Sequence, residues 1–169
     1  YKTIEFTGNA VKEMELDGRM TLCNMTVEAG AKNGIIEADD KVINYLKGRS
    51  EAPYEIYKSD PDYEYDQRFV INGDLLPPTV SKPGSSANAV PVVEVEGVPV
   101  TRALLGTCTN GRMEDFRIAA KILKGKKIDP KVRLQVIPAS RDIFRQCVSE
   151  GLIETFLDAG AIWGNPNCG

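Results

Sequence analysis

Thr107-Cys108-Thr109-Asn110-Gly111-Arg112 stands where an apolar run ends and a helix-like pattern begins. The apolar run covers 98–105, and Gly106 between the two permits a tight turn. A cysteine at a strand-to-helix junction meets unpaired backbone N–H groups, which favour the thiolate that metals bind. The alternative for Cys108 is a buried cysteine that serves as a small apolar residue.

A predicted helix follows the junction. Asn110 is expected to cap it, and Glu114 and Asp115 in its first turn favour the positive end of the helix dipole. The apolar positions expected along this helix are Met113, Phe116, Ile118, Ala120 and Leu123.

Strand and helix patterns alternate along the rest of this half of the chain. The expected elements are β-rich segments at 90–95 and 98–105, a strand at 132–137, a helix entered through Ser140 and ended by Gly151, and a strand at 161–163. Strands that alternate with helices in this order form parallel βαβ units. The predicted fold class is therefore α/β with a mainly parallel sheet.

The first half of the chain carries weaker patterns. The expected elements are a strand at 2–6, a helix at 18–31 preceded by Asp17, a strand or turn at 34–36, a helix from Asp39 or Asp40 through Leu46, and a hairpin of strands at 54–57 and 65–71. Turn and linker residues at 76–78 and 81–86 predict a boundary near residue 80. The expected domains are residues 1–80 and 81–169.

The composition limits the functions open to this chain. It has 169 residues, a net charge of −3 and four cysteines, which argues against a nucleic-acid binder and a disulfide scaffold. Neither a signal peptide nor an apolar run of about 18 residues is present, so we expect a cytoplasmic protein without a membrane partner. The chain lacks histidine and an initiating methionine, and we expect a piece of a longer protein.

Two cysteines are expected at the same edge of the sheet. Cys108 follows one predicted strand and Cys168 follows another. Ligands of open parallel sheets sit at the carboxyl ends of the strands. This placement predicts a shared metal site, whereas two unrelated loop cysteines would leave exposed free thiols, which are unusual.

Two motifs carry a resemblance to a known family. They are Gly106-Thr107-Cys108-Thr109-Asn110-Gly111-Arg112-Met113-Glu114-Asp115-Phe116-Arg117 and Arg19-Met20-Thr21-Leu22-Cys23-Asn24-Met25-Thr26-Val27-Glu28-Ala29-Gly30-Ala31. They resemble the aconitase superfamily of iron–sulfur hydro-lyases, and within it the large subunits of the 3-isopropylmalate dehydratase and homoaconitase type. Thr107 stands where the family usually has serine, which keeps the hydroxyl. The resemblance implies a three-layer α/β/α fold, with the first expected domain part of the family's second domain and the other the start of its third.

The resemblance also implies a cofactor, a 4Fe-4S cluster held by three cysteines. Cys108 matches the first ligand, and Cys168 in Asn165-Pro166-Asn167-Cys168 matches the second. The third would fall at position 171, so we expect the cluster to be absent or incomplete in this chain. The family's catalytic histidine and its small-subunit serine are also missing, and we expect the chain alone to be inactive.

The second motif supplies two candidate catalytic residues, Asn24 and Glu28. They lie four positions apart, on one face of the predicted helix, among apolar neighbours. The resemblance implies that both contact the site around the iron that has no cysteine ligand. The alternative is a solvated helix face.

Other candidates have weaker support. Cys23 and Cys147 lie on apolar helix faces and are expected in the core, and Glu5 is interpreted as structural. Arg112 and Arg19 are either cations near an anionic substrate or surface helix residues.

The function that the resemblance implies is the isomerisation of a 2-hydroxy acid by dehydration and rehydration. The substrate would be isopropylmalate in leucine biosynthesis or homocitrate in the homoaconitase reaction, each a small di- or tricarboxylate. The resemblance further implies a separate small subunit as partner. The alternative is a non-catalytic binding module that reuses the fold without a cluster.

Overall fold

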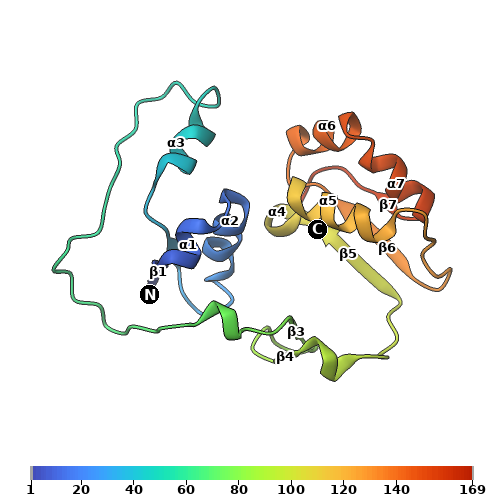
Figure 1. The fold of residues 1–169 in the computed structure, drawn as a ribbon, viewed down its shortest axis with the longest axis horizontal. Coiled ribbons are helices and arrows are strands. Elements are labelled where there is room, and N and C mark those ends of the chain that lie inside the picture. The colour runs from blue at the N-terminus through green and yellow to red at the C-terminus, as the bar shows by residue number, and fades with distance from the viewer. Residues whose placement is uncertain (1, 169) are drawn as a thin grey trace. The chain divides into compact units, whose positions relative to one another are not determined.

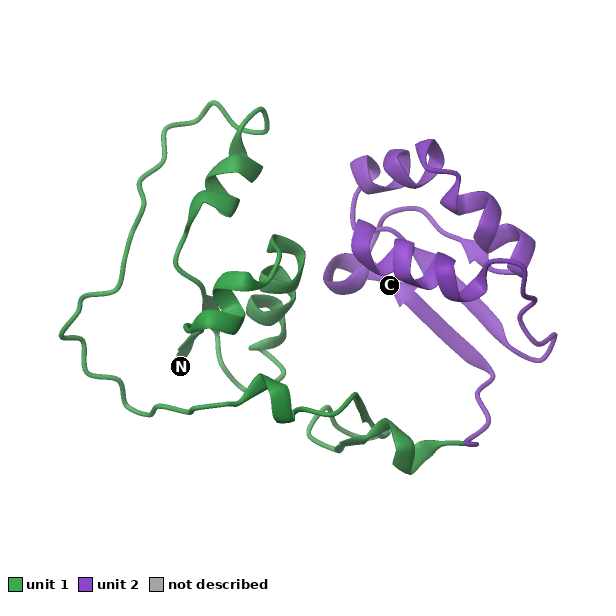
Figure 2. Cartoon of the chain, in the orientation of Figure 1, with its two compact units in different colours: residues 1–96 green, residues 97–169 purple. Residues whose placement is uncertain are grey.

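The structure is a computed structural model that describes residues 2–168, and the chain forms two compact units. The first unit is Tyr1–Glu96 and the second is Gly97–Gly169 (Figure 2). The compact units divide between residues 96 and 97, and residue 80 lies in a hairpin of the first unit in which 79–81 pair with 89–91.

The second unit is built on a three-stranded parallel sheet. Its strands are β5 (Arg102–Gly106), β6 (Arg133–Ile137) and β7 (Ile162–Trp163), in the order β5-β6-β7. The connecting helices are α4 (Thr107–Asn110), α5 (Met113–Leu123), α6 (Arg141–Ser149) and α7 (Leu152–Ala159) (Figure 1). The predicted α/β fold class with parallel βαβ units is confirmed.

The core of this unit lies between the sheet and α5, α6 and α7, which contact one another. Phe116 and Phe156 are fully buried and meet edge to face at 6.3 Å between ring centroids. Trp163 packs on both rings. Full burial of a phenylalanine side chain contributes roughly 2–3 kcal/mol to folding. Of the apolar positions expected along this helix, Met113 and Ala120 are buried, but Ile118 is 52% exposed and lies outside the core.

The helix ends explain where the chain turns. Ser140 caps α6 by accepting a hydrogen bond from the Ile143 N–H. The prediction that Asn110 caps the long helix is wrong: Arg112 occupies the N-cap of α5, and its backbone N–H donates to the Asp115 carboxylate. Gly151 and Gly160 adopt left-handed conformations at the two ends of α7.

The first unit begins with a two-stranded parallel sheet of β1 (Thr3–Glu5) and β2 (Asn33–Ile35). Its helices are α1 (Asn9–Glu13), α2 (Leu16–Met25) and α3 (Asp40–Leu46). A Cβ at Gly34 would lie 2.7 Å from the Cys23 Cα, so glycine permits the close approach of β2 to α2. The helix predicted at 18–31 ends early, at Met25, because the backbone after Met25 forms i to i+3 turns that the Ala31 N–H closes by bonding to the Thr26 carbonyl.

Residues 47–72 contain no helix or strand, so the hairpin predicted from 54–57 and 65–71 is wrong. Polar contacts tie this segment to β1: Ser59 and Tyr65 both donate to the Glu5 carboxylate, and Lys2 pairs with Asp66 at 2.9 Å. The remaining elements are the 3-10 helices η1 (Gly73–Leu75) and η2 (Val92–Val95) and the antiparallel pair β3 (Thr79–Ser81) and β4 (Ala89–Pro91). Among the described residues, no helix has both the length and the apolar character that a bilayer span requires.

Candidate metal centre

Cys108 lies in the turn that leaves the carboxyl end of β5. Two unusual backbone conformations precede it, with φ of 122° at Gly106 and 70° at Thr107. A positive φ is rare for a β-branched residue such as threonine and marks local strain. The chain therefore reverses sharply before Cys108 and presents it in the one-turn helix α4.

Two glycines let this turn pack against the end of β6. A Cβ at Gly106 would lie 1.9 Å from the Ile137 carbonyl oxygen, and a Cβ at Gly111 would lie 2.7 Å from the same oxygen. The Gly111 carbonyl in turn accepts a hydrogen bond of 2.9 Å from the Ala139 N–H. The cysteine turn is thus fixed to the neighbouring strand and to the loop that follows it.

Cys168 lies in the loop that leaves β7, and its sulfur is 3.6 Å from the sulfur of Cys108. Both thiols are exposed. The expected proximity of the two cysteines is therefore present in the structure, at the carboxyl edge of the sheet. Their interaction is asymmetric: the neighbouring Cys168 thiol lowers the pKa of Cys108, while hydrogen bonding to Cys108 raises the pKa of Cys168.

Arg112 contacts the backbone of the cysteine turn. Its Nη2 donates to the Cys108 carbonyl oxygen at 3.1 Å, while its buried Nε has no hydrogen-bond partner among residues 2–168. Sequence reasoning left Arg112 open between a substrate contact and a surface residue, and the structure shows a contact to the cysteine backbone. A buried guanidinium N–H without an acceptor is unfavourable, because the group loses its hydrogen bond to water and gains none in return.

The other two cysteines have different surroundings. Cys147 is fully buried beside the Met113 sulfur at 3.6 Å, and burial raises the pKa of Cys147 to about 11, which confirms its assignment to the core. Cys23 is half-buried in the first unit, and burial raises the pKa of its thiol.

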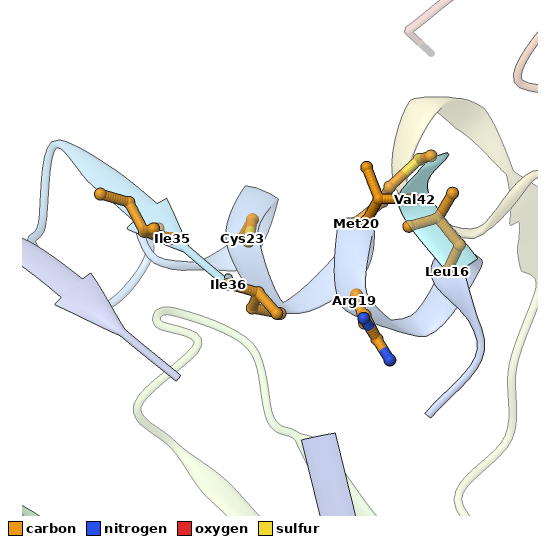
Figure 3. Close-up of a pocket in the computed structure, with 8 residues that line it drawn as sticks. Leu16, Arg19, Met20, Cys23, Ile35, Ile36 and Val42 are labelled. Atoms are coloured by element: carbon orange, nitrogen blue, oxygen red, sulfur yellow. The ribbon is translucent and has the colours of Figure 1, made fainter. Parts of the chain in front are cut away.

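Arg19 and Cys23 line an apolar cavity of about 290 Å³ in the first unit, together with Leu16, Met20, Gly34, Ile35, Ile36 and Val42 (Figure 3). Arg19 is only 3% exposed and donates to the Met14 and Lys12 carbonyls and to the Asp39 carboxylate at 2.7 Å. The structure therefore gives Arg19 a structural role that joins α1, α2 and α3.

Asn24 and Glu28 also belong to the first unit, so they do not share a compact unit with the two thiols. Asn24 lies near the end of α2, and Glu28 lies in the turn beyond it. Both are exposed, and only Asn24 lies in the helix, so the expected pair on one helix face is not formed. The reason is the early end of α2 at Met25, after which Glu28 N–H donates to the Met25 carbonyl in an i to i+3 turn.

A second cavity, of about 470 Å³, adjoins the loop that carries Cys168. It is lined by Arg141, Phe144 and Arg145 of α6 and by Asn165 and Pro166. Sequence reasoning missed this cavity, although two arginines one helical turn apart are a visible signal.

The donors present at the sheet edge fit a metal centre with soft ligands. Thiolate sulfur is the ligand of zinc and of iron–sulfur clusters. Two sulfurs bound to one tetrahedral ion at about 2.3 Å each lie about 3.8 Å apart, close to the separation seen here. In the part of the chain that the structure describes, no group of three cysteine, aspartate or glutamate side chains converges to complete such a site.

Comparison with known proteins identifies the family to which the chain belongs. The model of the aconitase family (aconitate hydratase) matches residues 1–98 and 91–169. The 3-isopropylmalate dehydratase large subunit of Desulfitobacterium hafniense is 47% identical over 169 residues, and that of Heliobacterium modesticaldum is 46% identical. A probable 3-isopropylmalate dehydratase large subunit of Methanothermobacter thermautotrophicus is also 46% identical. Each match covers 100% of this chain and 40% of the relative. The chain, which spans about two fifths of the length of these relatives, belongs to the aconitase family.

Proposed function

We propose that this chain is part of the large subunit of an iron–sulfur hydro-lyase that isomerises 2-isopropylmalate. The reaction removes the 2-hydroxyl and a neighbouring proton as water, and returns water with the opposite placement to give 3-isopropylmalate. Support comes from the names of the relatives, which match along the whole chain, and from the thiol pair at the sheet edge. The observation that carries the proposal is that Cys108 and Cys168 meet at one edge of the sheet, where the two loops can present thiolates to the same cluster.

In this proposal Cys108 and Cys168 hold a 4Fe-4S cluster, and a third cysteine comes from outside this chain. When bound, the cluster supplies Lewis-acid chemistry toward the hydroxyl and carboxylate of the substrate. The residues of this chain position the cysteine that binds the cluster. The contacts of Gly106 and Gly111 fix the turn that carries Cys108, and Arg112 holds the Cys108 carbonyl.

Asn24 and Glu28 are the proposed catalytic residues of this chain, as the resemblance implies. Both side chains are exposed, so a substrate can reach them. Asn24 orients the substrate or cluster by hydrogen bonding, and Glu28 accepts or donates a proton at the reacting carbon or hydroxyl. The assignment of 1–80 and 81–169 to the family's second and third domains belongs to the same proposal.

The proposal includes a small subunit as partner, because the relatives are named as large subunits. It also includes cytoplasmic localisation, as expected for free thiols that bind iron. Isopropylmalate is favoured over homocitrate by the relatives' names, and the homoaconitase reaction is the alternative with the same chemistry.

An enzyme assay tests this proposal. The protein encoded by the gene that contains this sequence is purified without oxygen together with its small subunit, and formation of the enoate intermediate from 2-isopropylmalate is followed. We expect turnover that requires iron and is lost by orders of magnitude in Cys108→Ser and Cys168→Ser, but kept in Cys147→Ser. Iron-loaded protein that dehydrates neither 2-isopropylmalate nor homocitrate would contradict the proposal and favour a non-catalytic module.

A further inference from the structure

We infer that the cavity beside the Cys168 loop binds a carboxylate that carries an apolar substituent, through Arg141 and Arg145. This inference rests on the proposed function, since it assigns residues of this chain to the substrate. The cavity lies within the second unit, and its volume of about 470 Å³ is in the range of small-molecule sites.

The charges around the cavity favour an anion. Arg141 has no carboxylate within ion-pair distance among residues 2–168. Arg145 has only a long contact of 3.6 Å with Asp142 of its own helix, and both side chains of this pair are largely exposed. Such a pair contributes little, so the guanidinium remains available. Two planar guanidinium groups are suited to bidentate recognition of carboxylates.

The other residues that line the cavity determine which kind of anion fits. Phe144 and Pro166 are apolar, and Asn165 supplies an amide that can both donate and accept. Phe144 is held in place by Trp163, with ring centroids 5.9 Å apart. An inorganic anion leaves this apolar surface unused, whereas an alkyl-substituted carboxylate covers it.

The position of the cavity links it to the thiol pair. Asn165 and Pro166 belong to the same loop as Cys168, whose sulfur is 3.6 Å from that of Cys108. A ligand held by Arg141 and Arg145 therefore lies beside the loop that carries one of the proposed cluster ligands. The cavity and one of the proposed cluster ligands therefore share a single loop.

The test is a titration of the ¹⁵N-labelled 169-residue chain with 2-isopropylmalate, followed by NMR. We expect saturable shifts of the Arg141, Arg145 and Asn165 amides, and affinity about tenfold or more weaker in the double variant Arg141→Gln and Arg145→Gln. The matched control is Arg102→Gln with Arg133→Gln, which removes the same charge at the amino ends of β5 and β6 and leaves affinity within about twofold. Arg141→Lys keeps the charge and should bind more weakly than the natural chain.

Two results would overturn the inference. One is the absence of saturable shifts at these amides. The other is equal binding of inorganic phosphate, which would show a general anion site. If 2-isopropylmalate does not bind here but the enzyme assay succeeds, this inference fails and the proposed function stands. If binding is seen but the assay fails, the ligand site stands and the proposed function does not.

Discussion

The sulfur of Cys108 lies 3.6 Å from the sulfur of Cys168, although the two residues are 60 positions apart in the chain. Each cysteine follows an outer strand of the parallel sheet, β5 and β7, on either side of β6. The contact is therefore a product of topology: parallel strands end at one edge, and the loops that leave them meet there.

The first prediction concerns the order in which the thiols react. Since the pKa of Cys108 is lowered and that of Cys168 is raised, Cys108 holds the thiolate at lower pH. Iodoacetamide added at neutral pH should alkylate Cys108 before Cys168, as followed by peptide mass spectrometry. Cys147, whose pKa is raised to about 11, should remain unmodified in the folded chain. Faster alkylation of Cys168 than of Cys108 would be inconsistent with the asymmetry.

The second prediction is a disulfide in the metal-free chain. The sulfurs need to approach by about 1.5 Å to reach bonding distance. Mild oxidation with diamide should link Cys108 to Cys168, with the loss of two hydrogens seen in a non-reduced peptide map. Cys168→Ser should form no internal disulfide, and Cys147→Ser should form the same one as the natural chain. A bridge that involves Cys23 or Cys147 instead would count against the geometry.

The third prediction tests the turn before Cys108. Gly106→Ala places a Cβ 1.9 Å from the Ile137 carbonyl oxygen at a φ of 122°, so the turn has to move or the sheet has to open. We expect a loss of about 3 kcal/mol or more in the free energy of unfolding, measured by urea denaturation. Gly125→Ala is the matched control, because its φ is 71° and no atom lies within 4 Å of the added Cβ. Its expected cost is about 1 kcal/mol. Equal effects of the two substitutions would show that the contact with Ile137 is unimportant.

The fourth prediction is an acid-sensitive ion pair in the first unit. The hydrogen bond from Arg19 lowers the pKa of Asp39, helped by the backbone N–H groups of Val42 and Lys41. A lowered folded-state pKa stabilises the fold above the ordinary aspartate pKa of about 3.9, and this contribution is lost as the pH falls through the folded-state value. Asp39→Asn keeps a helix N-cap and should cost about 1 kcal/mol at neutral pH, since Asp39 is partly exposed.

The pH dependence of unfolding in acid separates the loss of this ion pair from a general loss of stability. Unfolding of Asp39→Asn should depend less on pH below about 4 than unfolding of the natural chain. Arg19→Met leaves Asp39 without its cation and should cost about 3 kcal/mol, because the Arg19 side chain is buried. If unfolding of Asp39→Asn depends on pH in acid as strongly as unfolding of the natural chain, Asp39 is not responsible for the acid sensitivity.

The sequence predicted the second unit better than the first. In the second unit the local signals predict the same fold. These signals are the apolar runs at 98–105 and 132–137, the Ser140 cap and the glycines around α7, and each predicted element packs against a neighbour. The consistency of local signals with the parallel sheet explains why the meeting of Cys108 and Cys168 was predictable.

The failures arise where local pattern lacks a tertiary partner. Residues 54–57 and 65–71 alternate like strands, yet Tyr57 and Phe69 are 78% and 79% exposed and no strand pairs with them. Strand preference depends on cross-strand packing rather than on the backbone alone. The end of α2 was missed because Val27 follows Cys23 by four positions, as in a helix, although the backbone after Met25 forms turns. The role of Arg112 was unpredictable because arginine is an uncommon N-cap and its contact is to a backbone carbonyl.

The claim that Cys108 and Cys168 form one metal site is tested most directly by X-ray absorption of the chain loaded with one equivalent of Zn²⁺ under reducing conditions. The account predicts two sulfur ligands at about 2.3 Å, which fall to one in either Cys108→Ser or Cys168→Ser and stay at two in Cys23→Ser and Cys147→Ser. Two sulfur ligands that persist in Cys168→Ser, or no more than one in the natural chain, would contradict it.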